Sequence, residues 1–198
     1  MELINFKNQF LKNCKISNSE MAQIEPLITT KSVLKGEFLL KQGDLCSQFF
    51  FVEKGLLRFY ALNEDGKENI LQFATESWIV SDRGSIYFQV PSSYYIDAYE
   101  DTTVVLIDET FLRKITKINP DFMEHSERLL QNHIRHLYKR ISMLLGASAK
   151  TRYLDFIKTY PDITLRVPQW MIASYLGITP ESLSRVRKTL AKENFKPY

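Results

Sequence analysis

The chain of 198 residues is poor in the residues that build metal sites and disulfides. It has only two cysteines, Cys14 and Cys46, which are too few for a disulfide scaffold and lack the close partner spacing of a zinc site. An iron–sulfur cluster normally takes four thiolates, so we expect none carried by this chain alone. We therefore interpret both cysteines as reduced thiols and predict no metal and no bound cofactor.

Long apolar runs are missing as well. No stretch approaches the roughly 20 apolar residues of a membrane span. Residues 1–12 alternate apolar with charged and amide side chains, unlike the apolar centre of a signal peptide. The composition, 44% hydrophobic and 25% charged, is that of a globular protein with a buried core. These features predict a cytoplasmic protein without a membrane partner.

The motifs of enzymes are also absent. The sequence contains no nucleophile motif, no cluster of metal ligands and no glycine-rich loop that could hold a phosphate. We therefore predict that the protein is not an enzyme.

Positive charge, in contrast, gathers toward the C-terminal end. From residue 148 onward the chain has nine Lys and Arg and four Asp and Glu, which gives this segment a net charge of +5. The net charge of the whole chain is +3, so the remainder carries −2. A basic segment on a weakly acidic body is typical of a protein that binds a polyanion.

Short apolar runs separated by turn residues dominate residues 31–108. Many short strands with glycine-bearing turns indicate an antiparallel sandwich or barrel. A short helical segment precedes them over residues 4–28, with Asn18 or Ser19 as its expected N-cap. Residues 81–93 form a polar insertion that interrupts the strand rhythm. The expected strands lie at 33–34, 38–40, 49–52, 56–60, 70–73, 94–99 and 104–107.

After residue 108 the pattern becomes helical. Asn119 and Pro120 suit the start of a long helix that Gly146 ends. Within it, apolar residues alternate at spacings of four and three, as in a coiled-coil seam, and Glu127 takes the one polar slot. A second set of residues on this helix (Phe122, Leu129, His133) faces another way and could pack on the N-terminal domain. Because the helix would then be buried on two sides, we favour a homodimer. The alternative is a single amphipathic helix buried on its own domain. The seam comprises Met123, Leu130, Ile134, Leu137, Ile141 and Leu144.

Residues 169–188, QWMIASYLGITPESLSRVRK, have the pattern of a helix-turn-helix. Ala173 is small where two helices must approach closely, and Gly177 falls in the turn, where a positive φ is usually needed. Thr179 is a natural N-cap with Pro180 at the first helical position. We expect a helix over 150–160 and an extended piece over 163–167 before it. A helical hairpin with a purely structural role is the alternative. The apolar positions that would lock the two helices are Ile172, Leu176, Ile178, Leu183 and Val186.

The second helix of such a motif enters the major groove of DNA. Arginine can contact guanine O6 and N7, and glutamate can accept from cytosine N4. Glu181 and Arg185 lie one turn apart, so they could brace each other or form a surface pair without a DNA role. We assign base reading to Glu181, Ser184 and Arg185. The expected phosphate contacts, which position the protein, come from Thr179, Ser182, Arg187, Lys188 and Lys192.

Taken together, these segments resemble the Crp/Fnr family of bacterial transcription regulators over nearly the full length. KGEFLLKQGDLCSQFFFVEKGLLRFY (35–60) looks like the start of the family's cyclic-nucleotide-binding β-roll, and TPESLSR (179–185) looks like its recognition helix. The resemblance implies an α+β protein with an N-terminal antiparallel β-roll (double-stranded and jelly-roll-like), a long dimerisation helix and a C-terminal helix-turn-helix. The implied domains are 1–118, 119–146 and 147–198.

The resemblance also implies partners. We expect a homodimer on double-stranded DNA, at a palindromic operator with TTGA-like half-sites, and RNA polymerase as a possible further partner. Pro180 replaces an arginine of the catabolite-activator type, which puts two bases of the half-site in doubt. Residues 193–198, ENFKPY, leave at most a reduced wing after the recognition helix.

The effector region departs from the family pattern. Cyclic-AMP-binding members carry phenylalanine-glycine-glutamate and, about ten residues later, arginine followed by serine or threonine; residues 76–101 contain neither part in place. The three histidines lie on the long helix, which argues against haem. We predict an effector other than a cyclic nucleotide; a cyclic-nucleotide-responsive regulator, a ligand-binding module with a remodelled pocket, and a loop without ligand remain alternatives. The candidate pocket residues are Trp78, Asp82, Arg83, Tyr87, Ser92 and Ser93.

Overall fold

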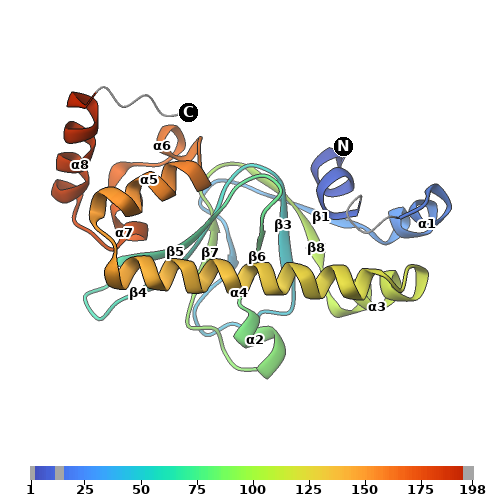
Figure 1. Cartoon of the computed structure of the whole chain (residues 1–198). Coiled ribbons are helices and arrows are strands. Elements are labelled where there is room, and N and C mark those ends of the chain that lie inside the picture. Colours follow the sequence, from blue (N-terminus) through green and yellow to red (C-terminus); the bar gives the residue numbers. More distant parts are fainter. Residues whose placement is uncertain (1–2, 12–15, 194–198) are drawn as a thin grey trace. The chain divides into compact units, whose positions relative to one another are not determined.

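The computed structural model of the protein describes residues 3–11 and 16–193 (Figure 1). Cys14, Lys196 and the expected wing at 194–198 lie outside these residues. Contacts between Cα atoms divide the chain into unit 1, residues 1–67 and 71–130, and unit 2, residues 68–70 and 131–198. The boundary at 130 lies inside one long helix, and the expected division at 118 and 146 stays a prediction.

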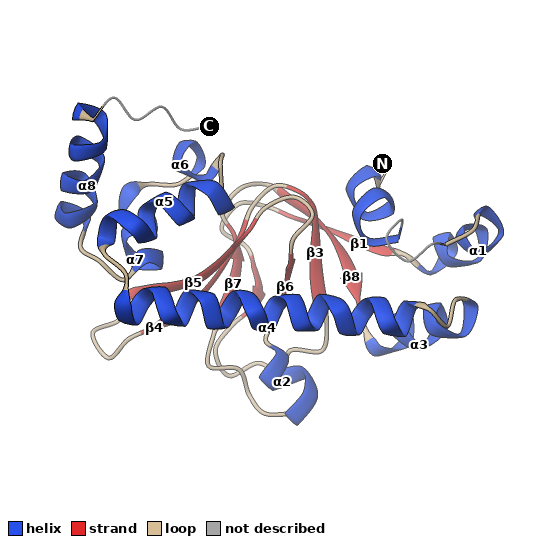
Figure 2. Cartoon of the chain, viewed as in Figure 1, coloured by secondary structure: helices blue, strands red, loops and turns tan. Residues whose placement is uncertain are grey.

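Two four-stranded sheets, with strand orders β1-β8-β3-β6 and β2-β7-β4-β5 (Figure 2), lie in unit 1 apart from residues 68–70 of β5, which belong to unit 2. The described pairings within them are antiparallel. This confirms the expected antiparallel β-roll within an α+β fold. The two-residue strand β6 had no counterpart in the sequence prediction. The strands are β1 Thr29–Val33, β2 Phe38–Leu40, β3 Phe49–Lys54, β4 Leu57–Leu62, β5 Glu68–Ala74, β6 Ile79–Val80, β7 Tyr95–Ala98 and β8 Thr102–Ile107.

The alternation of side chains along β3 creates two cores. Phe50 and Val52 belong to the core between the two sheets, together with residues of both. Phe49 and Phe51 face the opposite side, because successive side chains of a strand point to opposite faces. There they pack with residues of the N-terminal segment and of helix α3, Glu109–Ile118. The Phe6 and Phe51 rings meet edge to face, with centroids 5.1 Å apart.

Helix α1 begins earlier than the sequence suggested. Ser17, and not Asn18 or Ser19, is the N-cap of α1, Asn18–Ile24. Its hydroxyl accepts from the Glu20 N–H, and the Glu20 carboxylate accepts from the Ser17 N–H. This reciprocal capping box satisfies two free N–H groups, which explains why it prevails over the single caps expected. The segment also contains η1, Phe6–Leu11, and η3, Glu25–Leu27.

The long helix starts later than expected. Asn119 is not its N-cap but the C-cap of α3, because its N–H donates to the Ile115 carbonyl at 2.8 Å. Its own carbonyl accepts from the Phe122 N–H, so Asn119 and Pro120 form a tight turn between two helices. Helix α4 then runs over Phe122–Gly146, ending where the sequence indicated.

The polar insertion at 81–93 contains a helix that the sequence prediction missed. Asp82 caps α2, Arg83–Phe88, by accepting from the Ser85 N–H, and Gln89 ends the helix with a φ of 54°. A six-residue helix leaves little periodic signal, and Gly84 together with Pro91 made the segment resemble a loop.

Unit 2 consists of helices around the second part of α4. They are α5 Ala149–Thr159, α6 Ile163–Arg166, α7 Gln169–Leu176 and α8 Pro180–Lys192. The extended piece expected at 163–167 is wrong: α6 forms there, and the buried Ile163 anchors it. Tertiary packing thus overrides the weak strand preference of its β-branched residues. None of the helices in the described part of the chain has the length and apolar character that a membrane span needs.

Candidate nucleic-acid interface

Helices α7 and α8 are joined by a tight turn at Gly177. This residue has a φ of +62°, in the left-handed region that glycine adopts without strain. The next helix starts at Thr179, whose hydroxyl accepts from the Ser182 N–H at 3.2 Å. Pro180 occupies the first position of α8. The turn and the cap predicted from the sequence are therefore confirmed.

The two helices lock together through the apolar positions identified in the sequence. Ile172, Ala173, Leu176 and Leu183 are all buried. A buried aromatic group extends this core to α5: Phe156 of α5, Tyr160 directly after it and Tyr175 of α7 have ring centroids 5.3–5.6 Å apart. Helices as short as α7 depend on such packing, since isolated short helices are marginal in water.

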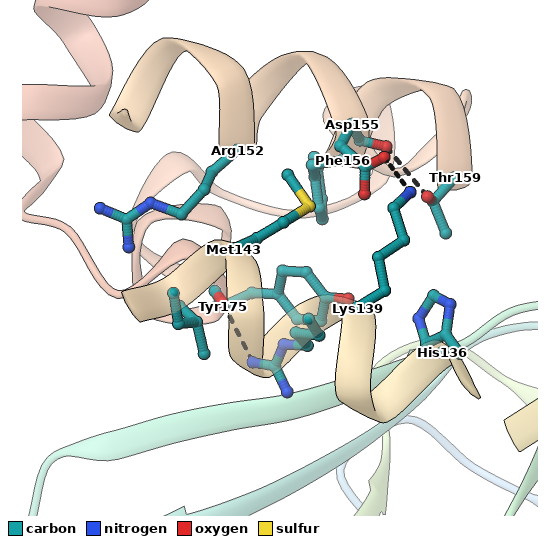
Figure 3. A pocket seen from close by; sticks show the side chains of 10 residues that line it. His136, Lys139, Met143, Arg152, Asp155, Phe156, Thr159 and Tyr175 are labelled. Carbon is teal, nitrogen blue, oxygen red and sulfur yellow. Dashed lines mark hydrogen bonds and ion pairs between the residues drawn. The ribbon is translucent and has the colours of Figure 1, made fainter. Parts of the chain in front are cut away.

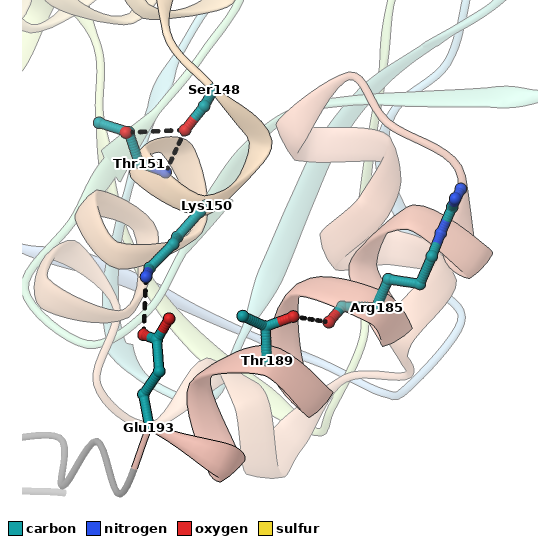
Figure 4. A network of polar contacts seen from close by, with 6 residues as sticks. All are labelled: Ser148, Lys150, Thr151, Arg185, Thr189 and Glu193. Carbon is teal, nitrogen blue, oxygen red and sulfur yellow. Dashed lines mark hydrogen bonds and ion pairs between the residues drawn. The ribbon is translucent and has the colours of Figure 1, made fainter.

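Helix α8 is also tied to α5 at its far end (Figure 4). The Lys150 ammonium donates to the Glu193 carboxylate at 2.7 Å. Ser148 caps α5 by accepting from the Thr151 N–H. The Lys150 pair is half-exposed, so its contribution to stability is small and its role is to position the end of α8.

The outward face of α8 gathers the predicted DNA-contacting residues. At about 100° per residue, Glu181, Ser184 and Arg185 share one face with Lys188 and Lys192. All five are exposed, and the buried Leu183 and Leu190 lie on the opposite face. Ser182 and Arg187 flank this exposed face on either side. The structure thus brings the predicted base-reading and phosphate-binding residues together on one surface.

Polar contacts at the start of α8 differ from the expected ion pair between Glu181 and Arg185. The Arg185 guanidinium donates to the Ser182 hydroxyl at 3.3 Å, and the described residues show no Glu181–Arg185 ion pair. Hydrogen bonds from its own backbone N–H and from Thr179 hold the pKa of Glu181 below its usual range, with a smaller contribution from the charge of Arg185. The carboxylate is therefore ionised and held at the N-terminus of the helix, where negative charge is favourable.

Three further residues, which sequence reasoning missed, hold the helix-turn-helix within unit 2; Figure 3 labels one of them, Arg152, together with Tyr175 of α7. The Arg140 guanidinium lies 4.2 Å from the centroid of the Tyr175 ring and donates to the Tyr175 carbonyl at 3.0 Å. Arg152 donates to the Leu176 carbonyl at 2.6 Å. The Ser174 hydroxyl donates to the Glu68 carbonyl and accepts from the Ile70 N–H. The sequence carries no local signal for these contacts, because they join positions far apart in the chain.

The seam of α4 is largely open in the single chain. Met123, Leu137, Ile141 and Leu144 are exposed. Leu130 and Ile134 are half-buried. Phe122 is the buried residue of this helix. The alternative of a helix fully buried on its own domain therefore does not fit.

The expected effector residues do not converge on one pocket. Trp78 packs against the core between the sheets. Asp82 caps α2, the buried Ser92 bonds to the backbone of Tyr94, and Ser93 is exposed. Only Arg83 and Tyr87 line the same cleft, a cavity of about 510 Å³ in unit 1. Within the described residues, no group of three or more His, Cys, Asp or Glu could hold a metal ion.

Comparisons with known proteins agree with this architecture. The sequence model of the cyclic nucleotide-binding domain family matches residues 30–119. Electron transport regulator A of Shewanella oneidensis is 26% identical over 183 residues, which cover 86% of this chain and 72% of the relative. The transcriptional activator protein anr of Pseudomonas aeruginosa is 28% identical over 163 residues, covering 77% and 66%.

A solved structure shows the same fold. FixK2 from Bradyrhizobium japonicum superposes with a TM-score of 0.71 at 22% identity, covering 84% of this chain and 86% of FixK2. By this domain match, these relatives and this fold, the chain is similar over most of its length to transcription regulators of the Crp/Fnr type.

Proposed function

We propose that the protein is a sequence-specific DNA-binding transcription regulator that binds a palindromic operator as a homodimer. One observation carries this proposal: α8 presents Glu181, Ser184 and Arg185 on an exposed face, while its opposite face is locked into the core of unit 2. A rigid helix with a polar outer face suits insertion into the major groove.

The residues of α8 have separate roles in this proposal. Arg185 donates two hydrogen bonds to guanine, and Glu181 accepts from the N4 amino group of cytosine. With Ser184 they read a TTGA-like half-site, as the family resemblance implies. Phosphate contacts position the helix without specifying sequence; they come from Thr179, Ser182, Arg187, Lys188 and Lys192.

The dimer forms through the exposed seam of α4. Its apolar positions recur every three and four residues, as the contact stripe of a coiled coil does. Two copies related by a two-fold axis place their recognition helices at half-sites whose centres are roughly 34 Å apart. The protein acts in the cytoplasm by binding and not by catalysis, and RNA polymerase is its further partner at promoters.

We further propose that the effector is not a cyclic nucleotide. Phe50, Ile96 and Val104 fill the space between the sheets, and Trp78 packs against them. The buried guanidinium of Arg58 is engaged by Asp97, with Nε 2.8 Å from Oδ1. A cyclic phosphate needs an available cation in a sheltered cleft. A calorimetric titration with cyclic AMP tests this point; a submicromolar affinity would contradict it and favour a cyclic-nucleotide-responsive regulator.

Binding to defined operators tests the main proposal. Fluorescence anisotropy would compare the full-length protein on a TTGA-type palindrome with variants of that site. Replacing Arg185 by Ala should cost about 1–3 kcal/mol and relax the preference for one guanine. Arg113, an exposed arginine of α3, provides the matched control, since Arg113→Ala should leave the affinity unchanged. Wild-type binding that does not distinguish the palindrome from a scrambled duplex would instead support a ligand-binding module with a vestigial DNA-binding end.

A further inference from the structure

The cleft of about 510 Å³ in unit 1 lies between α2, the first part of α4 and the outer face of a sheet. Its wall is mostly apolar, with one cation and two carboxylates. Three residues come from β-strands or their ends, and the others from helices. The residues used below are Phe49, Arg83, Tyr87, Met123, Glu127 and Leu130.

The cleft opens onto the dimer seam of α4. Met123, Glu127 and Leu130 occupy consecutive seam positions, at spacings of four and three, and all three line the cleft. A second copy that packs against the seam therefore also meets the mouth of the cleft.

Helix α2 lines the cleft through Arg83 and Tyr87, and exposed apolar side chains on it and directly after it are called the α2 patch below. Tyr87 is 63% exposed and Phe88 is 78% exposed, and Val90 directly after the helix is 49% exposed. Met123 of α4 is 60% exposed. Large apolar side chains grouped on one surface and rimmed by polar residues mark an interaction site.

The seam of α4 is small for a stable interface, which favours a dimer contact that extends beyond this helix. A stable interface buries about 800 Å² per partner, from roughly 20–30 residues on each side. The seam of α4 supplies six apolar positions and Glu127 over about three heptads, which is near the lower limit for a coiled coil. The α2 patch adds to the seam because Tyr87 lines the same cleft as Met123 and Leu130.

Charge also indicates which partner covers the patch. In a parallel pair of α4 helices the two Glu127 carboxylates face each other across the two-fold axis, and like charges so placed repel. The cleft holds a cation that can offset them. Arg83 is half-buried and lies 5.0 Å from the Phe49 ring centroid, and the described residues give it no carboxylate partner. The other carboxylate of the cleft, Glu124, pairs with Arg128 at 2.9 Å.

We propose that a second copy of this chain covers the cleft. In the dimer, Tyr87 and Phe88 of α2 pack against the first part of the partner's α4, and Arg83 faces Glu127 of the second copy. The cleft is lined by both a cation, Arg83, and an anion, Glu127, so a two-fold interface pairs them twice, once on each side. This inference rests on the dimer of the proposed function and adds to it a contact outside the coiled coil.

A charge exchange tests the ionic part. Sedimentation equilibrium would measure the dimer dissociation constant of the full chain, of Arg83→Glu, of Glu127→Arg and of the double variant. Each single variant should weaken the dimer at least about tenfold, because two pairs are lost per dimer. The double variant should return to within about threefold of the wild type, since it rebuilds both pairs with reversed sign. Additive losses in the double variant would overturn the proposed pairing.

A second pair of variants tests the apolar part. Phe88→Ser should weaken the dimer at least about tenfold, whereas Leu34→Ser, an exposed leucine of the same unit, should not. Native mass spectrometry of the wild type would reveal a small molecule in the cleft, which would overturn the inference. An unchanged dissociation constant in Phe88→Ser and both charge variants refutes the α2 contact and leaves the α4 dimer standing. A wild type that stays monomeric on operator DNA refutes both.

Discussion

Gly177 shows how much of the helix-turn-helix depends on single residues. Its φ of +62° lies in a region that other residues enter at a cost of about 1–2 kcal/mol. A Cβ atom there would also lie 3.2 Å from Cδ2 of Leu144. The turn is therefore restricted both by its backbone and by the neighbour that packs on it.

Replacing Gly177 by Ala should lower the free energy of unfolding by about 1–2 kcal/mol, mainly through the left-handed backbone. Urea denaturation followed by circular dichroism would measure this loss. Gly146 provides the control, since a Cβ there meets nothing within 4 Å and its φ is ordinary. Equal losses for Gly146→Ala and Gly177→Ala would show that the turn conformation is not the cause.

Helix caps and turns were predictable from the sequence where they depend only on neighbouring residues. Thr179, Pro180 and Gly177 follow capping and turn preferences, and the structure has them in those roles. Asn119 has equally good local features for a cap, but the α3 helix uses it at its C-terminus. The sequence could not distinguish these uses, because the choice depends on Phe122 entering the core of unit 1.

At the scale of elements, α4 combines an exposed seam with residues that support the helix-turn-helix. His136 lies near Lys139, Arg140 and Asp155 along the wall of a small pocket of unit 2 (Figure 3). Burial lowers the pKa of His136, and the charge of Lys139 lowers it further, while Asp155 acts in the opposite direction. The folded chain therefore resists protonation of this ring.

The stability of the protein should fall in mild acid as a result. In the unfolded chain His136 takes up a proton near its ordinary pKa of about 6.5, whereas the folded chain binds that proton only at lower pH. Stability is thus highest above this pH and declines as the pH falls through it. Urea unfolding at pH 7.5 and 5.5 should show a smaller decline for His136→Gln than for the wild type.

A residual decline is expected in that variant. The pKa of His125 is lowered as well, by burial and then by Arg128, so His125→Gln together with His136→Gln should flatten the profile further. A pH dependence that is identical in the wild type and the double variant would rule out this explanation.

The elements differ in how far the sequence determined them. The α4 seam was readable because its apolar spacing is regular over three heptads. Helices α2 and α6 were not, since six and four residues are too few for a periodic signal. Their formation depends on Asp82 as a cap and on buried Ile163, which are visible only in the folded chain.

At the scale of the whole molecule, the proposed function makes DNA binding depend on the dimer. Replacing Ile141, a seam residue that is 51% exposed, by Glu should dissociate the dimer through repulsion across the two-fold axis. Affinity for a palindrome should then fall at least about a hundredfold, because the second half-site no longer adds to the first. Sedimentation and anisotropy on the same samples would measure both effects.

Ser142 provides the matched control for this variant. It is exposed, adjacent to Ile141 and outside the seam positions, so Ser142→Glu adds the same charge without facing the partner. Loss of the dimer in both variants would indicate that charge on α4, and not its position in the seam, is responsible.

The overall architecture was predictable from the rhythm of turns and strands, whereas the pairing of strands was not. β1 pairs with β8, which lies more than 70 residues further along the chain. β6 contributes only two residues to its sheet. Such long-range pairings depend on which faces become buried, a property of the folded chain that short sequence windows do not contain.

The contact of Ser174 and Arg140 with residues 68–70 has a consequence for sequence variation. Both side chains bond to main-chain atoms, the Glu68 carbonyl and the Ile70 N–H and carbonyl. Every amino acid except proline supplies those atoms. Changes of the side chain at 69 therefore leave this contact intact, whereas positions 140 and 174 are held to a guanidinium and a small hydroxyl.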